Sequence, residues 1–207
     1  METLAVEPGN RSAAGLGFSK LAAILALVLL VIGAGVWFAG RGAPTAEFKS
    51  APAFELIDSN GQTFSSTTLR GKVWLASFFF TSCESVCPMV IGKMNTLFET
   101  APHQIHFVSF SVDPANDTPA ALKKYAAKFD ADTRRWHFLT GEQEKLRTVV
   151  SDGFQVSFPT SKAELDTHSL RLVLVDQNGQ IRGYFNSTDE EDMSRLRGIL
   201  EVYRGAL

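Results

Sequence analysis

Apolar and polar residues alternate in short blocks along most of this chain, and these blocks predict strands and helices in turn. The uncharged block Val73–Phe80 is typical of a strand that is covered on both faces. Apolar residues recur at helical spacing between Thr118 and Phe129, which predicts a helix there. The full pattern predicts strands at Phe54–Ile57, Gln62–Ser65, Val73–Phe80, Ile105–Val112, Trp136–Leu139, Leu170–Val175 and Ile181–Phe185, and helices at Val90–Thr100, Thr118–Phe129, Gln143–Val150 and Asp189–Val202.

This order of elements predicts an α/β fold with a mixed sheet that is flanked by helices. Two tight turns, at Asn60-Gly61 and Asn178-Gly179, join pairs of predicted strands, and Asn-Gly is a strong hairpin signal. The order of strands and helices is similar to that of thioredoxin-like folds.

The longest apolar block, Leu21–Ala39, predicts an N-terminal transmembrane helix, because about 20 apolar residues span the hydrocarbon core of a bilayer. A cleaved signal peptide is the alternative, although its apolar stretch is usually only about 7–15 residues long. Small residues such as Gly33 and Gly35 could serve a peptidase, so the alternative stays open.

The chain is therefore expected to have four parts. Residues 1–20 form a cytoplasmic tail, residues 21–40 the membrane anchor, residues 41–52 a linker and residues 53–207 the soluble domain. We expect a single-pass protein of the bacterial inner (cytoplasmic) membrane, with the domain on the periplasmic or extracytoplasmic side.

Charge and cysteine content exclude several classes of protein. With 20 Lys and Arg against 22 Asp and Glu, the net charge of −2 provides no basic field, so binding to nucleic acid is not expected. Two cysteines are too few for a disulfide-rich scaffold or for a four-cysteine zinc or iron–sulfur site.

Both cysteines, Cys83 and Cys87, lie between a predicted buried strand and the next helix. We expect Cys83 in the loop and Cys87 near the helix start, both at the surface. A helix N-terminus there lowers the pKa of a thiol. A disulfide that closes about five residues would stabilise the fold by only about 2 kcal/mol. A chemical role is therefore favoured: either a redox pair or two ligands for a soft metal such as copper(I).

Two thiols do not complete a metal site, so a third ligand is required. His103 is expected on the surface, whereas His106 and His137 are expected on strand faces rather than as ligands. His168 precedes the strand Leu170–Val175, whose entrance faces the cysteine loop in a thioredoxin-like arrangement. Spacing alone leaves its role as a ligand open.

Several motifs together resemble the Sco/SenC family of membrane-tethered, thioredoxin-like copper proteins associated with cytochrome c oxidase assembly. They are Thr81-Ser82-Cys83, Cys87-Pro88, Val112-Asp113-Pro114, Asp117-Thr118-Pro119, Trp136-His137-Phe138-Leu139-Thr140-Gly141 and Asp166-Thr167-His168-Ser169. The resemblance implies that Cys83, Cys87 and His168 bind a copper ion, Cu(I) or Cu(II). One departure is Glu84, because family members often have proline directly after the first cysteine.

Asp117-Thr118-Pro119 is also explained by local structure alone, as a helix N-cap followed by proline at an early helical position. A role for Asp113 near the metal loop stays possible.

Three functions follow, in order of preference. The first is a metallochaperone, a binding protein rather than an enzyme, which receives copper from an upstream donor. The resemblance implies cytochrome c oxidase subunit II as its acceptor. The second is a thiol–disulfide oxidoreductase in which Cys83 and Cys87 act as a catalytic redox pair on the acceptor's cysteines. The third is an assembly scaffold whose cysteines are incidental.

Overall fold

The computed structural model describes residues 22–23, 27–33, 49–83, 86–158 and 170–206. The chain divides into two units, Met1–Glu47 and Phe48–Leu207. In the first unit, residues 22–23 and 27–33 are helical. Within the described ranges, no helix combines the length and the apolar character that crossing a bilayer requires. Most of the predicted anchor Leu21–Ala39 lies outside the described residues.

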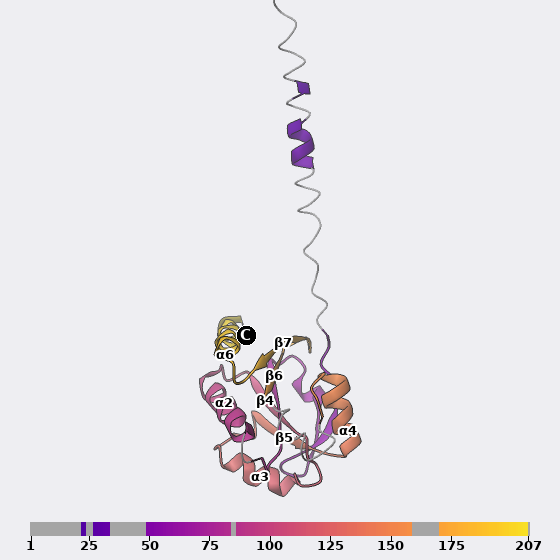
Figure 1. The fold of residues 1–207 in the computed structure, drawn as a ribbon, viewed down its shortest axis with the longest axis vertical. Coiled ribbons are helices and arrows are strands. Elements are labelled where there is room, and N and C mark those ends of the chain that lie inside the picture. The colour runs from indigo at the N-terminus through magenta and orange to yellow at the C-terminus, as the bar shows by residue number, and fades with distance from the viewer. Residues whose placement is uncertain (1–21, 24–26, 34–48, 84–85, 159–169, 207) are drawn as a thin grey trace, which may run out of the picture. The chain divides into compact units, whose positions relative to one another are not determined.

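The second unit contains every strand and helix that the pattern predicts (Figure 1). The strands are β1 Glu55–Asp58, β2 Thr63–Ser65, β3 Trp74–Phe79, β4 His106–Ser111, β5 Trp136–Thr140, β6 Arg171–Val175 and β7 Ile181–Asn186. The α-helices are α2 Val86–Thr100, α3 Pro119–Ala127, α4 Gln143–Arg147 and α6 Glu190–Ala206, with a 3-10 turn at Ser66–Leu69 and a π-helical turn at Thr148–Gly153. The largest differences are at α2, which begins four residues before the predicted start, and at α6, which ends four residues after the predicted end.

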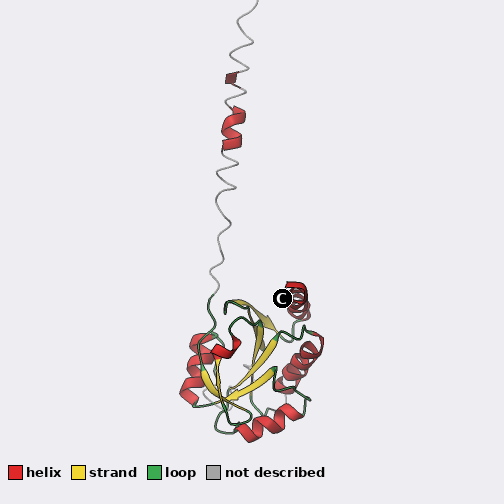
Figure 2. Cartoon of the chain, turned by 180° about the vertical axis from the view of Figure 1, so that it is seen from behind, coloured by secondary structure: helices red, strands yellow, loops and turns green. Residues whose placement is uncertain are grey.

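The strands form one mixed sheet (Figure 2). Their order in the sheet is β2-β1-β5-β4-β3-β6-β7. The three central strands β3, β4 and β5 are parallel, whereas β1, β2, β6 and β7 pair antiparallel with their neighbours. The sheet flanked by helices confirms the predicted fold class. Since the carboxyl ends of parallel strands share one edge, the segments after β3 and β4 are brought together.

Helices cover both faces of the sheet: α2 and α6 lie on one side and α4 on the other (Figure 1). On the first face, Phe98 of α2 packs against the rings of Phe107 and Trp136, at centroid distances of 5.3 and 5.4 Å. On the second face, Phe154 packs against Phe78 and Phe110, at 5.5 and 5.4 Å. The central strands are therefore buried between two aromatic layers, as their continuous apolar runs predict.

Residues 49–51, in the predicted linker, pair with the β6–β7 hairpin. Ile181 donates its backbone N–H to the Lys49 carbonyl at 2.8 Å, and Ala51 donates to the Gly179 carbonyl at 2.8 Å. Gly179 has a φ of 75°, in the left-handed region that glycine adopts without strain. The Asn178-Gly179 turn therefore both closes the hairpin and anchors the start of the domain.

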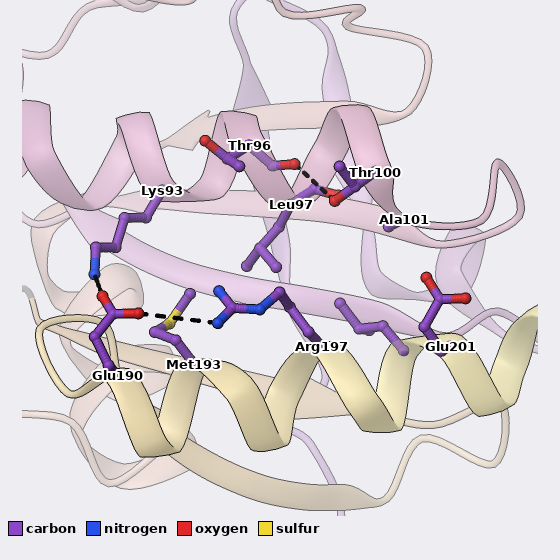
Figure 3. A pocket seen from close by; sticks show the side chains of 10 residues that line it. Lys93, Thr96, Leu97, Thr100, Ala101, Glu190, Met193, Arg197 and Glu201 are labelled. Carbon is purple, nitrogen blue, oxygen red and sulfur yellow. Dashed lines mark hydrogen bonds and ion pairs between the residues drawn. The ribbon is translucent and has the colours of Figure 1, made fainter.

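Helices α2 and α6 enclose a groove of about 350 Å³ between them (Figure 3). Apolar side chains of Leu97, Met193 and Leu200 lie between the two helices. Lys93 and Glu190 form an ion pair across the groove, with a distance of 2.6 Å between Nζ and Oε1. The ion pair connects the first half of α2 to the first turn of α6.

Candidate metal and redox site at the cysteine loop

The two predicted ligands lie where β3 ends and α2 begins. Cys83 follows β3 after a short turn, in which its backbone N–H donates to the Phe80 carbonyl at 3.3 Å. Cys87 is the second residue of α2, and Pro88 follows it within the first turn, where a missing backbone N–H is tolerated. The predicted positions of both cysteines along the chain are confirmed.

The expectation that both thiols lie at the surface is wrong. The exposed fraction is 5% for Cys83 and 0% for Cys87. The reason is the early start of α2, at Val86. Cys87 therefore already has helical geometry and belongs to the buried side of the helix, together with Val90 and Ile91.

The first turn of α2 also supplies a hydrogen bond to the cysteine pair. The backbone N–H of Cys87 donates to Sγ of Cys83 at 3.2 Å. The first N–H groups of a helix have no partner within the helix, and a donor aimed at sulfur favours the thiolate. The loop geometry thus stabilises negative charge on Cys83.

A buried carboxylate, Asp117, holds the base of the cysteine loop. Its Oδ1 accepts hydrogen bonds from the backbone N–H of Thr81 at 3.0 Å and from the Thr81 hydroxyl at 2.5 Å. Its Oδ2 accepts from the Ser111 hydroxyl at 2.6 Å. Asp117 therefore joins Thr81, two residues before Cys83 in the segment after β3, to Ser111 at the end of β4.

Burial raises the pKa of the Asp117 carboxyl, and the nearby Asp113 raises it further, while hydrogen bonds from Ser111 and Thr81 oppose the shift. Asp117 has no measurable exposure. A buried charge of this kind is tolerated only because donors surround it.

Sequence reasoning missed this role of Asp117. The N-cap predicted for Asp117-Thr118-Pro119 is confirmed, because Thr118 Oγ1 accepts from the backbone N–H of Ala121 at 3.2 Å and Pro119 opens α3. The available signal was that Asp117 follows β4, which neighbours the cysteine-bearing strand.

Three of the four histidines are described, and none lies with the cysteines. His103 is exposed on the connection before β4. His106 and His137 lie at the starts of β4 and β5, at the opposite edge of the sheet from the cysteine loop, because β3, β4 and β5 are parallel. Their predicted positions on strand faces are confirmed, since the rings stack in parallel, with centroids 6.1 Å apart.

The predicted third ligand, His168, lies outside the described residues. Within the described part of the chain, no group of three or more His, Cys, Asp or Glu side chains converges on one point. Asp113 lies beside the site region, where its carboxylate accepts a hydrogen bond from Asn116 at 2.8 Å. Of the three predicted ligands, the structure describes Cys83 and Cys87.

A family model described as SCO1/SenC matches residues 42–201. The chain belongs to this family. Three solved structures of family members are similar to this chain. A SCO1/SenC family lipoprotein from Bacillus anthracis is 32% identical with a TM-score of 0.67, and the match covers 77% of this chain and 99% of that chain.

The second structure is BsSco, described as a member of the Sco family of cytochrome c oxidase assembly proteins with a disulfide switch. It is 28% identical with a TM-score of 0.66, over 77% of this chain and 95% of that chain. The third is Bradyrhizobium japonicum ScoI with copper bound, 27% identical with a TM-score of 0.57, over 74% of this chain and 99% of that chain.

Proposed function

We propose that this protein is a membrane-tethered copper-binding metallochaperone that supplies or prepares copper for the copper site of cytochrome c oxidase. The observation that carries the proposal is the buried pair Cys83 and Cys87 at the junction of β3 and α2, with a backbone donor directed at Cys83 Sγ. The relative ScoI has copper bound, and BsSco belongs to a family of oxidase assembly proteins.

The chemistry of the donor set fits copper as cargo. Two thiolates are soft ligands that favour Cu(I), and an imidazole completes a three-coordinate set that could also accept Cu(II) with added oxygen ligands. We assign this imidazole to His168. The burial of both thiols limits access of water and oxidants to the sulfur atoms.

We assign the membrane attachment to Leu21–Ala39 and place the domain on the periplasmic or extracytoplasmic side of the bacterial inner membrane. A tether confines the site to the membrane surface and raises its effective concentration near a membrane-bound acceptor. The acceptor we propose is subunit II of the oxidase, and an upstream donor must supply the copper.

A thiol–disulfide oxidoreductase is the second candidate, and the hydrogen bond from the Cys87 N–H to Cys83 Sγ favours it, because it activates Cys83 as a nucleophile. In this reaction the Cys83 thiolate attacks an acceptor disulfide and releases one acceptor thiolate. The Cys87 thiolate then attacks Cys83 Sγ in the mixed disulfide and releases the second. The acceptor is reduced, Cys83 and Cys87 form a disulfide, and an external dithiol must reduce it again.

A Cu(I) titration of the full chain in detergent tests the first function. We expect Cys83→Ser, Cys87→Ser and His168→Ala each to lower the affinity at least about tenfold, because each removes one ligand. The exposed residue His103 provides the matched control, and His103→Ala should bind as the unmodified chain does. Unchanged affinity in Cys83→Ser and His168→Ala would exclude the metallochaperone.

The same variants separate the other functions. An oxidoreductase requires both cysteines for turnover with a dithiol reductant, but not His168. For the scaffold, a chain lacking both cysteines would still support oxidase assembly in cells.

A further inference from the structure

Lys49, the first described residue of the second unit, lies at the opposite end of the sheet from the cysteine loop. Its carbonyl accepts a hydrogen bond from the backbone N–H of Ile181 at 2.8 Å. Ile181 pairs with Val175, and Val175 pairs with Trp74, the first residue of β3. Cys83 follows the other end of β3. The start of the domain and the cysteine loop are therefore separated by the length of β3.

We call the edge of the sheet at Lys49 the tether edge and the edge at Cys83 the cysteine edge. The six residues of β3, Trp74–Phe79, separate the two edges. A strand rises about 3.3 Å per residue, so this separation is about 20 Å. The β6–β7 turn belongs to the tether edge, because the backbone N–H of Gly71, three residues before β3, donates to the Gln177 carbonyl at 3.1 Å.

The chain between the proposed anchor and the domain is short. Nine residues, 40–48, separate Ala39 from Lys49. A flexible chain of this length has a root-mean-square span of about 15–18 Å, and it reaches at most about 32 Å when fully extended. If the tether edge is nearest to the lipid, the chain needs no extension. If the cysteine edge is nearest, the chain must also run about 20 Å along the sheet, which exceeds its relaxed span.

Charge also opposes an orientation with the cysteine edge at the lipid. The segments that follow β4, β5 and β7 at this edge, residues 112–118, 141–142 and 187–192, contain no Lys or Arg. Their exposed or half-buried carboxylates are Asp113, Glu142, Asp189, Glu190, Glu191 and Asp192. Arg171, Lys93 and Arg195 on neighbouring elements offset part of this charge. Anionic headgroups therefore repel this edge over a Debye length of about 10 Å.

The tether edge carries cations that can approach such headgroups. Lys49, Arg70 and Lys72 form no ion pair within the described ranges, and Lys49 and Arg70 are exposed. Three carboxylates at this edge are held by other groups: Asp58 by N–H groups of its own turn, Asp132 by Arg134 and Asp176 by Arg182. Tether length and charge thus favour the same orientation.

We propose that the domain stands on an anionic bilayer with its tether edge against the headgroups and its cysteine edge about 20 Å farther out. The proposal rests on the membrane attachment through Leu21–Ala39 in the function above. It also specifies the partner. The groups that receive copper from Cys83 and Cys87 lie in an extramembrane domain of the acceptor, about 20 Å or more above the headgroups, and not at the lipid surface.

Energy transfer to a headgroup-labelled lipid tests this orientation in the full chain, reconstituted in nanodiscs that contain anionic lipid. A fluorescent non-natural amino acid replaces Gln177 at the tether edge in one variant and Ala115, in the connection after β4, in the other. Both positions are exposed. We expect the distance of closest approach to the labelled headgroups to be about 20 Å shorter at Gln177 than at Ala115. The matched control inserts about twenty Gly and Ser residues after Gly42, which raises the relaxed span of the linker to about 30 Å, and the difference should shrink.

Equal distances at the two positions, or a shorter distance at Ala115, would overturn the orientation and leave the membrane attachment intact. A difference that is unchanged in the lengthened chain would overturn the role of the short linker. Energy transfer at neither position would show that the chain is not anchored, which excludes the membrane attachment and the orientation together. Copper titration of the unmodified chain is independent of these distances and tests the metallochaperone separately.

Discussion

His106 and His137 form a stacked pair of neutral imidazoles at the edge of the sheet away from the cysteines. Burial, followed by the positive charges of Lys72 and Arg135, lowers the pKa of His106 to about 4. Burial, His106 and Lys72 likewise lower the pKa of His137 to about 4. Nδ1 of His106 is buried and has no partner among the described residues, which agrees with a ring that is kept uncharged.

From this histidine pair we predict that the folded domain loses stability in mild acid. As the pH falls from 6.5 to 4, the unfolded chain takes up protons on both histidines while the folded chain does not, so the free energy of unfolding falls. A pKa difference of one between the folded and unfolded chains corresponds to about 1.4 kcal/mol. Solvent screens part of this effect at half-buried rings, so we expect a total loss of about 2 kcal/mol at pH 4.5.

Urea unfolding at several pH values measures this loss, and His137→Phe should remove about half of it. Phenylalanine keeps the packing on Phe64, whose ring lies 4.4 Å from that of His137. The exposed His103 supplies the control, and His103→Gln should retain the full dependence on pH. An acid dependence that is the same in all three chains would contradict the assignment.

At the scale of elements, Asp117 connects two segments that are distant in sequence. It lies between β4 and α3, yet its carboxylate fixes Thr81 after β3. The pairing of Phe79 with Ser111 in the parallel β3–β4 register brings these segments together. The cysteine loop therefore depends on the connection before α3 for its position.

We expect Asp117→Asn to loosen the cysteine loop. An amide offers one acceptor oxygen and a donor NH₂, so it cannot accept the hydrogen bonds of Thr81 and Ser111 together. The free energy of unfolding should fall by about 1–3 kcal/mol, and hydrogen exchange at the Thr81 amide should accelerate. Asp130→Asn is the control at the far end of α3, because Asp130 has a φ of 48°, which asparagine tolerates. Slow exchange at Thr81 in Asp117→Asn would show that other contacts hold the loop.

The strands and helices could be predicted where the sequence signal is local. The parts of the site that depend on strand pairing could not be predicted. Apolar runs located β3 and β4, and the Asn-Gly turns located both hairpins. The burial of Cys87 was missed because the apolar pattern predicts a helix start at Val90, whereas α2 already includes Val86 and Cys87. The inward direction of Asp117 was missed because it follows from the β3–β4 register, which no local pattern specifies. The place of His168 stays a prediction.

At the scale of the whole molecule, the cysteine site and the acid-sensitive histidine pair lie at opposite edges of one sheet. The cysteine loop, Asp117 and the first turn of α2 lie at the carboxyl edge of the parallel strands, whereas the stacked histidines lie at the other edge. Between them, the aromatic layers on both faces form a continuous core. Acid stress at the histidine edge should therefore act on global stability, and changes at the cysteine edge should act on the site.

The division of the chain at residue 47 predicts that the second unit folds alone. A chain beginning at residue 46 keeps the pairing of residues 49–51 with the hairpin and the whole core, so its thermal midpoint should match that of the full chain. Its Cu(I) affinity should also be unchanged, because all three proposed ligands remain.

The location of the shortened chain should change: the full chain should sediment with the membrane fraction, and the shortened chain should be recovered in the soluble fraction. The matched control replaces residues 21–40 with a polar linker of equal length, which should also release the protein. Retention of either the shortened or the replaced chain in the membrane would contradict the anchor, because attachment would then reside in the domain.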